Sequence, residues 1–250
     1  VREDTFAMAV DAGLRNISVG VESGSGRVRR KVLKRNYRDE HTQFVFDLAH
    51  KYKIRCSSFN IIGLPDEDRE DIMKTIMLNR ELNPTSATVT FFHPYRGAPL
   101  RDLCVEMGYI PETQGKHEDV YRSESQLIMP QITKDELRGL MSSFQLYMKL
   151  PEKYHELIKK QEDSSSDESV EIREKILLPL FREIQDNESK WDFRKKEEWW
   201  TSDIDGREEI NAKVKLPHTT PGDAGYIPLH AKPKEYFKKE MYPGNESIVT

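Results

Sequence analysis

Residues 19–25 read VGVESGS, an apolar strand pattern that stops at an acidic residue and runs into small, flexible residues. In α/β proteins, a strand followed by a glycine-rich turn commonly brings ligand-contacting groups to the end of a sheet. The sequence therefore predicts a strand over 17–21, with Glu22 at its tip and Ser25 as the N-cap of the basic helix that follows.

The same strand-turn-helix order recurs through the first 110 residues. Further strands are expected over 54–63 (IRCSSFNIIG) and 85–92 (TSATVTFF), and helices over 3–12, 39–53 and from the acidic turn DEDRED to Pro84. Three such units predict a parallel sheet or barrel. The turns that follow the strands then share one end, where these folds build active sites.

The pattern changes after residue 110. Helices are expected over 134–160 and over 172–185, the second interrupted by Pro179, with an acidic loop between them. Beyond residue 187 the composition is charged and rich in Pro and Gly, which predicts a loosely ordered tail. We thus expect three parts: an α/β part over 1–110, a helical extension over 111–186 and a polar tail over 187–250.

Composition excludes several classes of protein. The net charge is -4 over 250 residues, with basic and acidic residues interspersed, so no nucleic-acid platform is evident. No apolar run approaches the roughly 20 residues of a membrane span. Cys56 and Cys104 lack the spacing of metal ligands and the histidines form no ligand pairs, so we expect no metal site. Two cysteines that form no disulfide framework also fit a reducing compartment, so we expect a cytoplasmic location. The chain starts at Val1, inside a predicted helix, and we interpret it as part of a longer protein.

Three segments together resemble a known family: AGLRNISVGVESGSGRVRRKVLKRN, FNIIGLPDEDREDI and FFHPYRGAPLRDLC. They are similar to the second half of the radical S-adenosylmethionine (radical SAM) barrel, especially in the cobalamin-associated group of cyclases and methyltransferases. The resemblance covers residues 1–110 and extends more weakly over 133–160. It implies a partial (β/α) TIM-like barrel with a helical C-terminal extension.

The resemblance also implies a chemistry. S-adenosylmethionine would lie across the strand ends, and a 4Fe-4S cluster held by a CxxxCxxC loop would donate an electron to its sulfonium. The resulting 5′-deoxyadenosyl radical would abstract hydrogen from a small-molecule substrate. The protein's part is to position the cofactor and exclude water.

Two charged residues receive roles from the resemblance. Glu22 matches the polar residue that contacts the ribose, and the turn from Ser23 onward lets the backbone approach the ligand. Arg35 matches the arginine that pairs with the methionyl carboxylate, for which a guanidinium fork is suited. The alternatives are that Glu22 only caps or pairs with the next helix, and that Arg35 belongs to a solvated basic cluster.

The adenine is expected to meet five further residues. Ile61 and Gly63 would lie beside it on the second strand, and Phe92, Pro94 and Tyr95 would line its edge after the third. Alternatively, Gly63 only ends a strand, and either Phe91 or Phe92 faces the core by alternation. The loop reads PYRGA where the family has PYPGT, and Phe59 stands where some members carry a ribose-contacting acid.

The cluster ligands are absent, because three thiolates are needed and the chain has two scattered cysteines. We therefore expect the cluster, the missing N-terminal half of the barrel and any cobalamin domain to lie outside this chain, which alone is expected to be inactive. Whether cobalamin is used stays open. The alternatives are a catalytically silent half-barrel that binds a nucleoside or a partner protein, and an ordinary TIM-barrel enzyme. RNA methylthiolation is a further possibility within the family.

Overall fold

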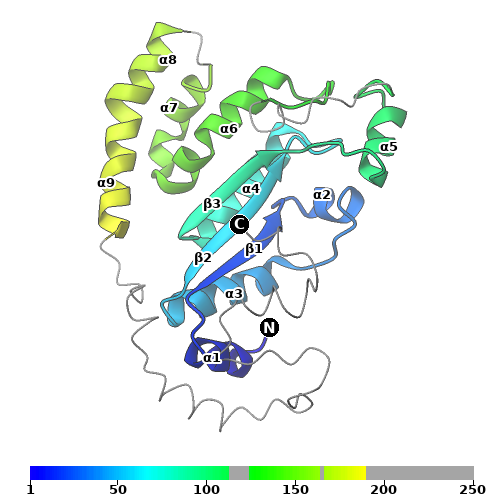
Figure 1. Ribbon diagram of the computed structural model, residues 1–250. Coiled ribbons are helices and arrows are strands. Elements are labelled where there is room, and N and C mark those ends of the chain that lie inside the picture. Colours follow the sequence, from blue (N-terminus) through cyan, green and yellow to red (C-terminus); the bar gives the residue numbers. More distant parts are fainter. Residues whose placement is uncertain (113–123, 164–165, 190–250) are drawn as a thin grey trace, which may run out of the picture. The chain divides into compact units, whose positions relative to one another are not determined.

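A computed structural model describes residues 1–112, 124–163 and 166–189 (Figure 1). The strands are β1 (Asn16–Glu22), β2 (Arg55–Ile62) and β3 (Ser86–Phe91). The helices are α1 (Glu3–Asp11), α2 (Gly26–Lys31), α3 (Asp39–Lys51), α4 (Arg69–Leu82), α5 (Pro99–Glu106), α6 (Lys134–Lys149), α7 (His155–Lys160), α8 (Asp167–Glu171) and α9 (Leu178–Ser189). A 3₁₀ turn, η1 (Glu152–Tyr154), and a π-helical turn, η2 (Ile172–Leu177), complete them.

The three strands form one parallel sheet in the order β1-β2-β3. β1 and β2 begin level, since Asn16 pairs with Arg55, and β3 begins level with the third residue of β2, since Ser86 pairs with Ser57. The predicted α/β class with parallel strands is confirmed. Among the described residues the sheet is open, with β1 and β3 at its two edges.

One face of the sheet is covered by helices. Along β2 the residues Cys56, Ser58, Asn60 and Ile62 are all buried, while those between them are not. The covering helices are α3 and α4, which lie behind the sheet in Figure 1. Two apolar clusters fill this layer: one joins α1 and α3 to the early parts of the strands, and the other joins α4 and α6 to the strand ends.

No described helix covers the opposite face, which carries the alternate residues of each strand. Its side chains are small or polar over most of the sheet: Asn16, Ser18, Gly20, Arg55, Ser57, Ser86, Thr88 and Thr90. Two larger apolar residues, Phe59 and Ile61, lie on this face toward the end of β2. We call it the open face. The side chains on this face that lie near the C-terminal ends of the strands are next to the strand tips, where the candidate site is expected.

Local chemistry explains where α4 begins and ends. The Asp68 carboxylate accepts the Asp71 amide at 2.9 Å, and the Asp71 carboxylate reaches back to the Asp68 amide, which forms a capping box. The helix ends at Asn83, whose left-handed backbone (φ 43°) is typical of helix termini. Ile72 and Ile76, four residues apart on α4, are both completely buried.

Two predicted helices of the extension need correction. The helix expected over 134–160 is broken, because Pro151 disfavours a helical conformation at Leu150, which is extended. Pro179 was expected to interrupt the second helix, but the chain stays helical from α8 through the π-helical turn η2 into α9, and the change from π to α geometry lies directly before the proline. The basic helix after Ser25 is also shorter than expected and ends at Lys31.

The predicted tail over 187–250 lies outside the described residues, apart from its first three positions, which end α9. Across the part of the chain that the structure describes, no helix combines the length and apolar character needed to cross a bilayer.

Candidate functional site

The ends of the three strands lie along one edge of the sheet, as parallel pairing requires. Glu22 is level with Asn60 across β1 and β2, and Ile62 is level with Phe91 across β2 and β3. All eight residues predicted to bind the cofactor lie at or after these ends. Glu22 is the last residue of β1 and Ile61 lies one position before the end of β2, and the other six lie in the segments that follow the strands. The structure thus brings the predicted residues to one edge, although it does not bring all of them to one surface.

Glu22 occupies an unusual backbone position at the tip of β1. Its φ of 61° lies in the left-handed region, and the pairing with β2 shifts between Gly20 and Glu22, which marks a bulge. The Ser23 amide donates to the Val21 carbonyl at 2.7 Å across Glu22, which forms a tight three-residue turn. Strained residues of this kind persist where the surrounding structure holds them, commonly at ligand sites.

The Glu22 carboxylate folds back over the open face. A Cβ built on Gly20 would lie 2.8 Å from Glu22 Oε1, so a side chain at that position would displace the carboxylate from where it lies. The same oxygen lies 3.1 Å from Arg35 Nη1, and the Glu22 side chain is 16% exposed. The two charged residues predicted separately from sequence are therefore one ion pair beside the tip of β1.

The loop after Glu22 is held by α4. The Gly24 amide donates to Thr75 Oγ1 at 2.8 Å, the Ser23 and Thr75 hydroxyls lie 3.4 Å apart, and Ser25 Oγ donates to Asp71 Oδ1 at 2.5 Å. Ser25 also accepts the amide of the third residue of α2, so its predicted role as N-cap is confirmed. Ser23 as a whole is fully buried, and its carbonyl accepts a hydrogen bond from Arg29 Nη1 at 2.8 Å, so its predicted contact with the cofactor stays a prediction.

The hydrogen bonds continue from this loop into β2. Asn79 Nδ2 donates to Asn60 Oδ1 at 2.7 Å, and Ser58 Oγ donates to Asn79 Oδ1 at 2.5 Å. We call the connected buried side chains the polar seam: Ser23, Ser25, Ser58, Asn60, Asp71, Thr75 and Asn79. The α4 members recur every four residues and so form one stripe of the helix that faces the sheet. Sequence reasoning missed this stripe.

On β2, Ile61 is half-buried on the open face, and its predicted contact with adenine stays a prediction. Phe59 lies on the same face two residues earlier, level with Gly20 and Thr88, and is 45% exposed. No role was predicted for Phe59, although strict alternation along the strand could have placed it there. Gly63 has φ 72°, a left-handed conformation that favours glycine, while an added Cβ would meet Leu137 only at an ordinary contact distance of 3.4 Å.

The residues after β3 divide between core and surface. Phe92 and Pro94 are buried, and the Phe92 amide donates to the Ile62 carbonyl at 2.8 Å. Phe91 is buried as well, so both phenylalanines contribute to the core. Tyr95 is 59% exposed and its ring lies 4.4 Å from that of His93. Of these three predicted residues, Tyr95 alone presents its side chain to solvent.

Glu67 is the most deeply buried carboxylic acid near the strand ends. Its Oε2 accepts the Leu64 amide at 3.0 Å, and its Oε1 is buried with no partner among the described residues. Burial raises the pKa of Glu67 to about 8, and its hydrogen bonds to the Leu64 and Gly63 amides counteract only part of that shift. Glu67 therefore closes the turn after β2, while Asp68 caps the helix.

The two cysteines do not fit a 4Fe-4S cluster. Cys56 and Cys104 are both fully buried and free, and burial raises the pKa of each thiol, that of Cys104 to about 11. Cluster ligands are thiolates, which such sites disfavour. Among the residues that the structure describes, no three His, Cys, Asp or Glu side chains are grouped to hold a metal ion. The prediction that any cluster is held outside this chain stays a prediction.

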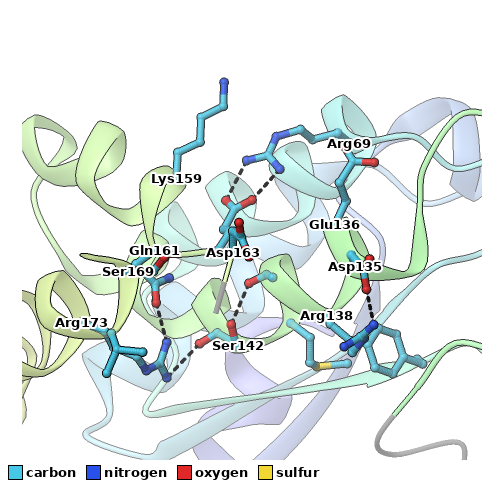
Figure 2. A pocket seen from close by; sticks show the side chains of 15 residues that line it. Arg69, Asp135, Glu136, Arg138, Ser142, Lys159, Gln161, Asp163, Ser169 and Arg173 are labelled. Carbon is cyan, nitrogen blue, oxygen red and sulfur yellow. Dashed lines mark hydrogen bonds and ion pairs between the residues drawn. The ribbon is translucent and has the colours of Figure 1, made fainter. Parts of the chain in front are cut away.

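A large cavity of about 1010 Å³ lies elsewhere, between the start of α4, α6 and the segments from α7 to η2 (Figure 2). None of the eight predicted residues lines it. Its charged groups are largely paired with one another: Arg69 donates to both oxygens of Glu162 at 2.7 Å, and Arg173 donates to Gln161 at 2.8 Å. We interpret this cavity as the junction between the α/β part and the extension.

Comparison with known proteins gives one distant match. No family model matches the chain. Over 84 residues the chain is 32% identical to a tRNA-2-methylthio-N(6)-dimethylallyladenosine synthase from Ehrlichia ruminantium (strain Welgevonden). The match covers 33% of this chain and 19% of the synthase, so the chain spans a small part of that protein. The shared segment relates this chain to part of that synthase.

Proposed function

We propose that this chain forms the C-terminal part of a radical SAM barrel and binds S-adenosylmethionine across the ends of β1, β2 and β3. The observation that carries the proposal is the ion pair of Glu22 and Arg35 on the open face, with Glu22 in a left-handed conformation at a strand tip. The synthase match and the three sequence motifs support the same class.

Each end of the ligand has a chemical counterpart. The Glu22 carboxylate accepts hydrogen bonds from ribose hydroxyls, and the Arg35 guanidinium turns from Glu22 to the methionyl carboxylate, which it binds with two N–H groups. Ile61 and Phe59 give the adenine an apolar surface on the open face. Gly63, Phe92 and Pro94 shape the backbone at the rim, and Tyr95 closes over it.

The remaining parts of the enzyme are assigned to residues beyond this chain. A 4Fe-4S cluster would supply the electron for cleavage of the sulfonium, and its thiolates are proposed to belong to the missing N-terminal half of the barrel. This chain's own residues bind and orient the nucleoside and keep water from it. The parent is then an enzyme that acts on a substrate of unassigned identity. The synthase match gives no support for cobalamin.

The ion pair can be tested by equilibrium binding of S-adenosylmethionine and of adenosine to the 250-residue chain. Arg35→Gln is expected to weaken S-adenosylmethionine binding by about tenfold, because a charge-assisted hydrogen-bond pair is lost, and to leave adenosine binding unchanged. Glu22→Gln is expected to weaken both ligands, since both carry the ribose.

Arg30→Gln is the matched control, because Arg30 is an exposed arginine on the neighbouring helix α2. It should leave both affinities within about twofold of the wild type. The proposal is wrong if the wild-type chain binds neither ligand, or if Arg35→Gln and Arg30→Gln have equal effects on S-adenosylmethionine.

A further inference from the structure

We infer that Thr75 and Asp71 are positioning residues for Glu22, and that they act through the loop formed by residues 23–25. The inference rests on the proposed function, because it concerns how the ribose-binding carboxylate is held. Neither side chain reaches the open face, where the ligand is proposed to lie, because both face the sheet from α4 and are fully buried.

The left-handed backbone of Glu22 needs support from both sides. On its N-terminal side, β1 is fixed by its pairing with β2 up to Gly20. On its C-terminal side the chain leaves the sheet, so the conformation depends on what holds the next residues. An unfavourable φ at a residue with a side chain relaxes when one side is released.

Thr75 provides a single hydroxyl that meets both residues after Glu22. Thr75 Oγ1 donates to the Asp71 carbonyl at 3.2 Å and accepts the Gly24 amide at 2.8 Å. The Ser23 hydroxyl, 3.4 Å away, completes its contacts. Gly24 also packs so closely on α4 that an added Cβ would lie 2.3 Å from the Lys74 carbonyl oxygen. The loop therefore lies directly against the helix backbone.

Asp71 holds the far side of the loop. Its carboxylate accepts the Ser25 hydroxyl at 2.5 Å and forms an ion pair with Arg27, which also contacts Asp66 at 2.5 Å. Burial alone would raise the pKa of Asp71, but the hydrogen bonds from Arg27 and Ser25 outweigh it and keep the carboxyl ionised. A fixed charge thus holds Ser25, which caps α2, at the position where the loop ends.

An apolar contact would bury α4 equally well but would not fix the loop in one orientation. Hydrogen bonds depend on direction as well as distance, so Thr75 and Asp71 specify where Ser23, Gly24 and Ser25 lie. Because Glu22 is joined covalently to Ser23, its backbone is held as well, and the ion pair with Arg35 then holds the carboxylate. The polar seam is in this sense an extension of the proposed binding site into the helix layer.

The test compares Thr75→Val, which removes the hydroxyl, with Thr75→Ser, which keeps it. Both are made in the 250-residue chain, with Thr42→Val in α3 as the control for a buried threonine. We expect Thr75→Val to raise hydrogen exchange at the Gly24 amide without ligand, and to weaken S-adenosylmethionine binding by about tenfold. Thr75→Ser should restore both to within about twofold, and Thr42→Val should change neither.

Several results would overturn the inference. Unchanged exchange at Gly24 shows that Thr75 does not hold the loop, and raised exchange with unchanged affinity shows that the loop does not position Glu22. A wild-type chain that does not bind S-adenosylmethionine instead overturns the proposed function. If Thr75→Val does not fold, as judged by circular dichroism, Gly24→Ala displaces the same loop by steric contact and should weaken binding equally. Unchanged affinity in Gly24→Ala overturns the inference.

Discussion

Replacing Glu162 with alanine is expected to lower the free energy of unfolding by about 3 kcal/mol, the scale at which one partner of a buried ion pair is lost. The Glu162 side chain is 9% exposed and accepts two hydrogen bonds from Arg69 and one from Tyr147, at 2.6 Å. Burial and the Glu162 carboxylate raise the pKa of Tyr147, so its hydroxyl stays a donor. Truncation leaves a guanidinium and a buried hydroxyl without their acceptor.

Urea unfolding followed by circular dichroism measures this loss. Glu156→Ala is the control, because Glu156 is an exposed acid on α7, and surface substitutions of this kind change stability by about 0.5 kcal/mol or less. The structure predicts a large difference between the two variants. Equal stabilities would show that the contact between α4 and the extension contributes little to folding.

The second large effect concerns pH. In the wild type, the free energy of unfolding is expected to fall as pH rises from about 5 to 8, because Glu67 is buried. Glu67→Gln is expected to abolish this fall. The pKa of the buried Glu67 is about 8, raised by burial from an ordinary value of 4.5. Between these values the folded state binds a proton that the unfolded state has released. Stability contributed by this group is therefore fully present at low pH and falls by about 1.4 kcal/mol per pH unit.

Glutamine keeps an acceptor for the Leu64 amide and carries no charge at any pH. The free energy of unfolding of the variant should match that of the wild type near pH 4.5 and exceed it by about 3 kcal/mol at pH 7. The contributions of the other titratable groups are the same in both proteins and cancel in this difference. Urea midpoints at successive pH values measure the difference. Glu70→Gln, which replaces an exposed acid in the first turn of α4, should give a curve parallel to that of the wild type. A parallel curve for Glu67→Gln would show that Glu67 does not titrate as a buried acid.

Much of the fold was predictable because its signals are local. Alternation along 54–63 and the small residues after Glu22 define strands and their tips, and the positions of Ile72 and Ile76 define a helix face. The sequence also indicated Glu22 and Arg35 as charged residues of interest. Their pairing depends on a bulge and on the absence of a side chain at Gly20, which residue spacing does not reveal.

The polar seam could not be predicted from the same signals. Asp71, Thr75 and Asn79 recur at helical spacing, but polar residues at that spacing usually form a solvated helix face. Asn79 is buried here because Ser58 and Asn60 of β2 offer it hydrogen bonds, and Asp71 and Thr75 are buried because the loop over 23–25 does the same. A pattern within one helix says nothing about the chemistry of the strand that it will meet. The break at Pro151 is different, since the proline was visible and its effect on Leu150 was overlooked.

The polar seam also limits how α4 can settle on the sheet. Leucine and isoleucine side chains tolerate sliding, because apolar surfaces attract one another with little regard for alignment. Moving α4 by one turn would break its bonds to Ser25, Gly24 and Asn60 together and leave each of those groups buried without a partner. The helix therefore has one acceptable register along β1 and β2. Misaligned forms not only lose these hydrogen bonds but also bury polar groups without partners, which raises their free energy during folding.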